Sequence, residues 1–92
     1  MKLEYSVRFT EEGKKKLHEL HIVTQREIKK GLKELTKNID LRKALVGRLS
    51  GFYSFAIGKY RAIYSVKKYL IMVHYVGHRK NAYSDFGNEI LN

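Results

Sequence analysis

Three strand-like runs joined by very short connections fill the C-terminal half of the sequence. The runs are FYSFAI from Phe52, YRAIYSV from Tyr60 and YLIMVHYV from Tyr69, and all are rich in the aromatic and branched residues that strands prefer. Only Gly58 and Lys59 separate the first two runs, a Gly-X pair that suits a type II′ turn. Strands joined this tightly pair antiparallel, so the sequence predicts a three-stranded antiparallel meander.

The turn at Gly58 and Lys59 also predicts which side chains share a face of the sheet. A two-residue loop fixes the register, so it pairs Ile57 with Tyr60 and Ala56 with Arg61. The face expected to pack against helices then holds Tyr53, Phe55, Ile57, Tyr60, Ala62, Tyr64 and Val66. The opposite face is expected to stay open as a shallow groove, and it holds Ser54, Ala56, Arg61, Ile63 and Ser65.

The second connection has weaker turn chemistry, because its two residues are Lys67 and Lys68. If these two residues form the turn, His74 lies opposite Arg61 on the open face. A slip of one residue would reverse every side chain of the third run. The same register puts three further side chains on the helix-packed face, namely Ile71, Val73 and Tyr75. After Gly77 the chain is expected to leave the strand.

The N-terminal half predicts a strand followed by two helices. Apolar residues alternate with polar ones over residues 3–9, LEYSVRF, which indicates a half-buried strand with Leu3, Tyr5, Val7 and Phe9 on one side. Thr10 is then a suitable N-cap for a helix of about three turns. A second helix is expected to begin at Thr24, which is followed at capping-box spacing by Glu27.

These elements follow one another without a linker, a repeat or a low-complexity tract, so residues 1–92 are expected to form a single domain. The predicted fold class is α+β. An N-terminal strand and two helices precede the meander, and all strands form one sheet with the helices on one face.

The charge of the chain favours a polyanionic partner. Its 19 Lys and Arg residues against 9 Asp and Glu give a formal net charge of +10, and such a potential attracts nucleic acid or an acidic protein. No cysteine is present, which fits a reducing compartment. No run reaches the roughly 20 apolar residues of a membrane span. We therefore expect a cytoplasmic protein without membrane contact.

One group of residues suggests phosphate chemistry. Cleavage of RNA without a metal needs cations around the phosphate and groups that transfer protons. The guanidinium groups of Arg61 and Arg79 fork onto phosphate oxygens. The imidazoles of His74 or His78 titrate near neutrality, and the ring of Tyr83 can stack on a base as well as exchange a proton.

Each of these residues also has a plain structural interpretation. The arginines are equally suited to surface ion pairs, the histidines to packing, and Tyr83 to anchoring the tail on the sheet. His18 and His21 have the spacing of a metal pair, but no further ligands accompany them, so no metal is expected. The sequence has no GxGxxG or P-loop pattern, so no nucleotide or other small-molecule cofactor is expected.

Three motifs of the sequence carry a family resemblance. They are LVG from Leu45, GKYRAIYSV from Gly58 and VGHRKNAY from Val76. Together with the order of the elements, they resemble the RelE branch of the RelE/ParE toxin superfamily over nearly the whole chain. The specific part is the glycine hairpin with Tyr-Arg-x-Ile-Tyr, followed by Val-Gly-His-Arg and a tyrosine.

The resemblance implies a RelE-like toxin of a type II toxin–antitoxin system. Such a toxin enters the ribosome, cleaves mRNA there by attack of the 2′-hydroxyl, and inhibits translation as an mRNA interferase. Its partners would be a cognate antitoxin protein, the ribosome and mRNA. The matching motifs place Arg61, Arg79 and Tyr83 in the catalytic group of this endoribonuclease, and Lys59 and Lys80 beside them as RNA-binding residues.

The sequence departs from this family pattern at two positions of the open face. Ser54 and Ala56 stand where many RelE-like proteins have lysine or arginine. His74 and His78 are candidates to replace those cations; otherwise the activity is weakened or lost. Two further functions therefore stay open: a ParE-like inhibitor of DNA gyrase, and an inactive relative that only binds an antitoxin. We expect the antitoxin to wrap the helices and the sheet edge with an acidic segment that folds on binding.

Overall fold

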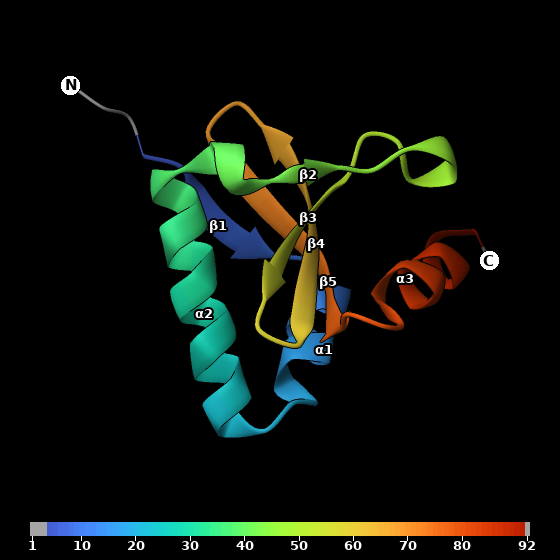
Figure 1. Cartoon of the computed structure of the whole chain (residues 1–92), viewed down its shortest axis with the longest axis horizontal. Coiled ribbons are helices and arrows are strands. Elements are labelled where there is room, and N and C mark those ends of the chain that lie inside the picture. The colour runs from blue at the N-terminus through green and yellow to red at the C-terminus, as the bar shows by residue number, and fades with distance from the viewer. Residues whose placement is uncertain (1–3, 92) are drawn as a thin grey trace.

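The computed structural model describes residues 4–91 and contains a five-stranded sheet between two unequal sets of helices (Figure 1). The strands lie in the order β1-β5-β4-β3-β2, with β1 parallel to β5 and the other neighbours antiparallel. The elements are β1 Ser6–Phe9, α1 Glu11–His18, α2 Ile22–Lys37, β2 Lys43–Ala44, β3 Tyr53–Ile57, β4 Tyr60–Lys67, β5 Leu70–His78 and α3 Ala82–Leu91, with 3-10 turns at Ile39–Leu41 and Gly47–Leu49. The predicted α+β class is confirmed, with β2 and α3 as additions.

The entry into α1 follows the predicted capping chemistry. The hydroxyl of Thr10 accepts a hydrogen bond from the amide of Gly13 at 3.0 Å, which satisfies one of the free donors of the first turn. Helix α1 spans 8 residues, about one turn less than expected. Val7 and Phe9 of β1 and Tyr5 just before it pack against the core as predicted, whereas Leu3 lies outside the described residues.

Helix α2 begins earlier than the capping-box motif predicted. Its N-cap is His21, whose Nδ1 accepts a hydrogen bond from the amide of Val23 at 3.2 Å. Thr24 is therefore inside the first turn, and its prediction as the N-cap was wrong. The apolar residues Ile28, Leu32 and Leu35 recur at helical spacing and are buried against the sheet.

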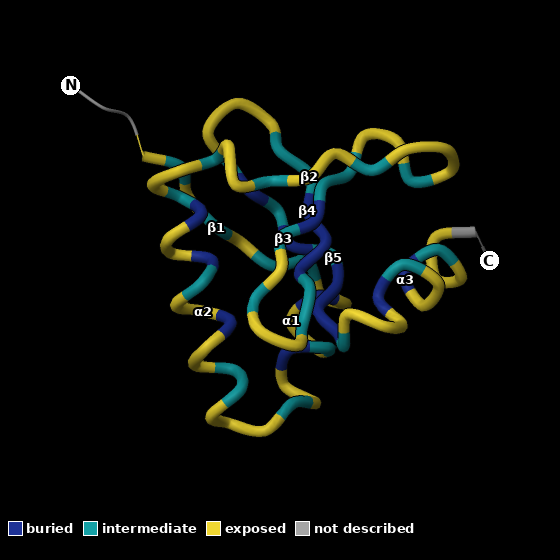
Figure 2. Tube along the Cα trace, viewed as in Figure 1, coloured by how far each residue is buried: buried dark blue, intermediate teal, exposed yellow. Residues whose placement is uncertain are grey.

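The hairpin of β3 and β4 has the predicted register. Ile57 pairs with Tyr60 and Ala56 with Arg61, and Gly58 has the positive φ of 60° that the tight turn requires. The face predicted to pack on the helices does so. Its side chains join a core that also contains Leu17, Ile28, Leu32, Leu35, Ile71, Val73 and Val76. The buried segments of α2 and of the central strands appear dark blue in Figure 2.

The predicted register of β4 and β5 was wrong. The turn residues are Lys68 and Tyr69, so Lys67 pairs with Leu70, and Lys68 takes a positive φ of 56°. A bulge then places Ile63 opposite Tyr75 but Tyr64 opposite Val73. His74 is the extra residue of this bulge and does not lie opposite Arg61.

The bulge also changes the face on which Tyr75 lies. Ile71 and Val73 contact α1 and α2 as predicted, but Tyr75 packs on the other face with Ile63, and Val76 takes the inward position after the bulge. Arg61 pairs with Gly77 rather than with His74. The prediction of Tyr75 on the helix-packed face was therefore wrong, because one extra residue shifts the alternation.

Strand β5 also continues through Gly77 to His78, whereas the sequence suggested that the strand ends there. A Cβ atom at Gly77 would lie 2.6 Å from the ring of Tyr75 and 2.7 Å from its hydroxyl. Because Gly77 has no side chain, the ring of Tyr75 can lie in the space that a Cβ atom would fill. This glycine serves packing within the strand and is not a strand terminator.

Helix α3 covers part of the face that was expected to stay open. Ala82 and Phe86 are buried with Ile63 and Tyr75 in a second, smaller core. Two polar contacts add to it: the Tyr75 hydroxyl donates to Asp85 at 3.0 Å, and Lys16 of α1 forms a 3.1 Å ion pair with Glu89. The helices therefore occupy both faces, α1 and α2 on one and α3 on the other (Figure 1).

The contact of α1 with β5 predicts that alanine changes the free energy of unfolding in opposite directions at Gly13 and Gly87. A Cβ atom at Gly13 would lie 2.3 Å from the carbonyl oxygen of Val73, which belongs to backbone that is fixed by strand pairing. Gly13→Ala should therefore lower the free energy of unfolding by roughly 1 to 3 kcal/mol. Chemical denaturation followed by circular dichroism measures this.

Gly87→Ala is the matched control for that substitution. Gly87 lies in α3 and a Cβ atom there meets nothing within 4 Å. Alanine should raise the free energy of unfolding by roughly 0.5 to 1 kcal/mol, because it has the higher helix propensity. Equal effects of the two substitutions would contradict the close packing of α1 on β5.

Candidate functional site

Three side chains from separate elements meet on the α3 side of the sheet. The hydroxyls of Ser54 in β3 and Tyr83 in α3 are hydrogen bonded at 2.9 Å. Arg61 of β4 donates from Nη1 to the Ser54 hydroxyl at 3.2 Å, and its guanidinium carbon lies 5.5 Å from the centroid of the Tyr83 ring. A cation, a phenol and a buried serine thus form one connected group.

The fold explains why these residues meet. Ser54 and Arg61 project from adjacent strands on the same face, because Ser54 pairs with Ile63 and Arg61 precedes Ile63 by two residues. Tyr83 is brought there by α3, since its neighbours Ala82 and Phe86 are buried in the second core. The group is thus assembled across the whole C-terminal half of the chain.

The guanidinium of Arg61 retains unused binding capacity. It carries five N–H donors, of which one contacts Ser54, and the side chain is only half-buried. Among the described residues the one ion pair joins Lys16 and Glu89, so no carboxylate neutralises Arg61 there. Such a cation beside a hydroxyl and an aromatic ring is suited to bind an anion such as phosphate.

Three further predicted residues lie at the end of the sheet where Arg61 is located. The amide of Arg79 donates to the carbonyl of Lys59 at 2.8 Å, which ties the segment between β5 and α3 to the β3–β4 turn. Arg79, Lys59 and Lys80 are exposed. The structure therefore surrounds the strand ends next to Arg61 with three cations, although none of them contacts Arg61 directly.

His78 lies on the face opposite Arg61. It pairs with Tyr60, and the two rings meet edge to face at 5.9 Å, while Tyr60 packs on the core of α1 and α2. Its Nδ1 accepts a hydrogen bond from the amide of Lys80 at 3.2 Å. The imidazole is thus joined to the Arg79 segment through its backbone and does not belong to the group around Ser54.

His74 lies on the α3 side of the sheet but apart from Arg61. Its Nε2 and the hydroxyl of Ser65 are hydrogen bonded at 2.8 Å, and its ring meets those of Phe52 at 5.2 Å and Phe86 at 6.2 Å. Gly77, the partner of Arg61, is three residues away, or about 10 Å along the strand. Burial lowers the pKa of His74, as expected for an imidazole packed between aromatic rings.

Sequence reasoning missed the role of Ser54 in this group. Ser54 was noted for the cation that it lacks, yet it is 1% exposed and contacts both Arg61 and Tyr83. The available signal was its place beside Arg61 on one face of the hairpin. The connection to Tyr83 required knowledge of α3, which the sequence pattern did not predict.

The described residues do not gather a metal-binding group. No set of three His, Asp or Glu side chains within residues 4–91 is arranged to hold a metal ion. His21, one of the two histidines with metal-like spacing, caps α2 through its Nδ1. No described helix is long and apolar enough to cross a membrane.

Comparisons with known proteins identify the family. The model of the family described as the ParE toxin of type II toxin–antitoxin systems, parDE, matches residues 7–83. The chain belongs to this family, within the RelE/ParE superfamily, and is a toxin of a type II toxin–antitoxin system. No curated protein matches the chain closely enough to add to this assignment.

Solved structures agree with this assignment. The RelBE2 toxin–antitoxin complex of Mycobacterium tuberculosis contains a chain that is 26% identical, with a TM-score of 0.78 over 84% of this chain and 100% of the other. The RelB–RelE complex of Methanococcus jannaschii gives 25% identity and a TM-score of 0.65 over 85% and 96%. A mutant of E. coli RelE in the free state, 23% identical with a TM-score of 0.75 over 96% and 99%, shares the fold.

The packing of His74 predicts a dependence of stability on pH. Because the folded state holds His74 at a lowered pKa, the unfolded state binds the proton first as the pH falls through about 6.5, which favours unfolding. The loss of stability between about pH 7.5 and about pH 5.5 should therefore be smaller in His74→Gln than in the wild type. Urea midpoints at the two pH values measure this, and an identical loss in both proteins would contradict it.

Proposed function

We propose that this toxin is a ribosome-dependent mRNA endonuclease that cleaves by metal-free attack of the 2′-hydroxyl. The observation that carries the proposal is the meeting of the Arg61 guanidinium and the Tyr83 phenol around the Ser54 hydroxyl. The resemblance of the Tyr-Arg and Gly-His-Arg motifs to the RelE branch supports it, as does the likeness to solved RelE structures.

The reaction requires little beyond positioning and charge. The 2′-oxygen attacks the adjacent phosphorus, a new P–O2′ bond forms, and the P–O5′ bond breaks, which leaves a cyclic phosphate and a 5′-hydroxyl. The 2′-oxygen loses a proton and the leaving 5′-oxygen gains one. Negative charge grows on the non-bridging oxygens, where the fork of Arg61 stabilises it.

We assign the remaining roles by position. Tyr83 provides the hydroxyl for proton transfer at the 2′-oxygen and a ring on which a base can stack. Arg79, Lys59 and Lys80 hold the flanking phosphates at the strand ends. His78 lies on the other face of the sheet and positions this segment, because its Nδ1 accepts a hydrogen bond from the amide of Lys80. His74 receives no role in the reaction, because it packs between Phe52 and Phe86.

Substitutions at Arg61 and Tyr83 test the proposal. Primer extension on mRNA from cells that express the wild-type toxin should show cuts in register with codons. Arg61→Ala should reduce the cuts by roughly 10²-fold or more, because the phosphorane loses its charge-assisted contact. Tyr83→Phe should reduce them while preserving the fold, because it removes only the hydroxyl bonded to Ser54.

Arg26→Ala is the matched control, because Arg26 is an exposed cation on α2 and its loss changes the net charge by the same amount. It should leave cleavage intact. His78→Ala should slow cleavage more than His74→Ala. Cuts that persist in both Arg61→Ala and Tyr83→Phe would refute the assignment of the site.

Inhibition of DNA gyrase is the second candidate function. Two observations favour it: the matching family model describes ParE toxins, and Ser54 and Ala56 lack the cations expected on the open face. In that case cellular mRNA stays intact, and plasmid supercoiling changes when the toxin is expressed. The two readouts from one culture separate the candidates.

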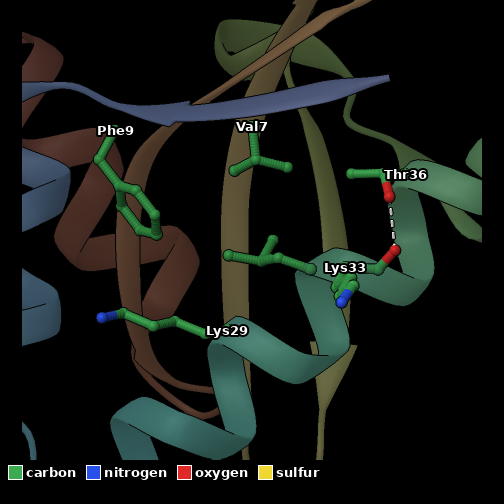
Figure 3. A pocket seen from close by; sticks show the side chains of 6 residues that line it. Val7, Phe9, Lys29, Lys33 and Thr36 are labelled. Carbon is green, nitrogen blue, oxygen red and sulfur yellow. Dashed lines mark hydrogen bonds between the residues drawn. The ribbon is translucent and has the colours of Figure 1, made fainter. Parts of the chain in front are cut away.

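We further propose that the toxin is held inactive by an acidic antitoxin that docks between β1 and α2. A hollow of about 260 Å³ there has an apolar floor of Val7, Phe9 and Leu32, with Lys29 and Lys33 at its rim (Figure 3). Apolar side chains of an amphipathic segment fit the floor, and carboxylates fit the rim. The related RelBE2 and RelB–RelE structures are complexes with antitoxins.

Charge reversal in this hollow tests the antitoxin proposal. Lys29→Glu with Lys33→Glu should weaken association with the cognate antitoxin by tenfold or more, since rim contacts change from attractive to repulsive. Association of the wild type should also weaken between low salt and about 0.5 M salt. Isothermal titration measures both, with Lys30→Glu and Lys37→Glu as a control of equal charge. Equal weakening by the two pairs, or insensitivity to salt, would contradict a charged rim at this place.

A further inference from the structure

A second positively charged hollow lies at the far end of the sheet from Arg61. It has a volume of about 550 Å³ and is lined by Ser6 and Arg8 of β1 and by Lys67, Lys68, Tyr69 and Leu70 around the β4–β5 turn. We call it the distal basic hollow. Its side chains take no part in the proposed reaction or in the proposed antitoxin hollow between β1 and α2.

The electrostatics of the distal basic hollow favour an anion. Arg8, Lys67 and Lys68 are exposed, and within residues 4–91 none of them takes part in an ion pair. No carboxylate lines the hollow, although Glu4 lies four residues before Arg8 in the sequence. Three cations around one hollow therefore add their potentials without local neutralisation.

An aromatic ring stands among these cations. Tyr69 is 53% exposed although it is a large aromatic side chain. Its ring meets that of Tyr5 edge to face at 5.4 Å, and the positive φ of Lys68 shapes the tight turn that presents it. A fixed, exposed ring beside cations is the arrangement on which nucleic-acid bases stack while their phosphates bind to lysine and arginine.

Part of the distal basic hollow shares a face of the sheet with the site at Arg61, whereas Tyr69 lies at the turn with its ring against Tyr5. Lys67 follows Arg61 by six residues, an even number, so the two side chains project from the same side of β4 at a separation of about 20 Å. Cross-strand pairs place Ser6 opposite Leu70, and Leu70 opposite Lys67, on that side as well. One strand of nucleic acid can therefore contact both places.

We propose that the distal basic hollow binds single-stranded RNA, with phosphates on Arg8, Lys67 and Lys68 and a base stacked on Tyr69. The inference rests on the proposed function in so far as RNA is the substrate, and it adds a second contact away from the scissile phosphate. An anionic membrane fits less well, because surface binding to lipid needs a broad apolar face and the hollow offers one aromatic ring.

The test is the binding of an uncleavable RNA of about ten nucleotides, methylated at each 2′-oxygen, to the purified toxin over a range of salt concentrations. Tyr69→Leu should weaken binding roughly tenfold with an unchanged salt slope, because stacking is lost and charge is kept. Lys67→Ala with Lys68→Ala should reduce the salt slope by about 1.4, since each phosphate contact on a single strand contributes about 0.7.

Two controls make the outcome specific. Tyr69→Phe keeps the ring and should bind like the wild type, which separates stacking from folding. Lys30→Ala with Lys37→Ala removes the same charge from α2 and should change the slope by less than the pair at the turn. Wild-type affinity in Tyr69→Leu, equal slopes in the two lysine pairs, or binding to vesicles of anionic phospholipid without binding to the RNA would overturn the inference.

Failure of the endonuclease proposal would give a different experimental result. In that case the wild-type toxin leaves cellular mRNA uncut, while the effects of Tyr69→Leu on the methylated RNA persist. Loss of those effects with normal cutting would overturn the distal basic hollow alone.

Discussion

The β-bulge at His74 is the constraint on which the two-sided packing of the sheet depends. Before it, Ile71 and Val73 face α1 and α2; after it, Val76 resumes that position and Tyr75 faces α3. Without the extra residue, Tyr75 would point into the larger core and Val76 toward α3. The bulge thus supplies each core with a side chain of suitable size from a single strand.

Helix α1 contacts the backbone beside this bulge. The carbonyl of Val73 accepts hydrogen bonds from both the amide of Thr10, at 2.9 Å, and its hydroxyl, at 3.3 Å. The same hydroxyl caps α1 through Gly13, so one threonine links the helix terminus to the irregular part of the strand. This arrangement provides the Val73 carbonyl with partners on the β1 side of β5, at the point where β1 ends.

The sequence predicted those parts of the fold in which local chemistry determines geometry. The Gly58 turn fixed the β3–β4 register because only glycine accepts its backbone conformation readily. The β4–β5 register failed because the left-handed residue is Lys68, which no turn preference indicates. Likewise His21 rather than Thr24 caps α2, because its Nδ1 accepts a hydrogen bond from the amide of Val23, and histidine is not among the residues that normally predict an N-cap.

The same distinction applies to the candidate site. Arg61 could be placed on the α3-side face from alternation alone, and its strand register with Ala56 was predictable. The position of Tyr83 depends on α3, a helix that was not predicted because its sequence AYSDFGNEIL contains a glycine, although Asn81 before it is a favourable N-cap residue. The hydrogen bond between Ser54 and Tyr83 was therefore beyond sequence reasoning, although each residue stood in a motif that had been noticed.

The members of the site are held with unequal strength, and this follows from how each element is anchored. Ser54 and Arg61 belong to strands whose neighbours pair on both sides, so separating them requires opening the sheet. Tyr83 is held by α3, for which Ala82 and Phe86 are the buried apolar anchors, with Asp85 and Glu89 as polar contacts to Tyr75 and Lys16. Elements with few buried contacts open at lower free energy than central strands. The phenol is therefore the member of the group whose placement is easiest to lose, while the guanidinium keeps its position as long as the sheet persists.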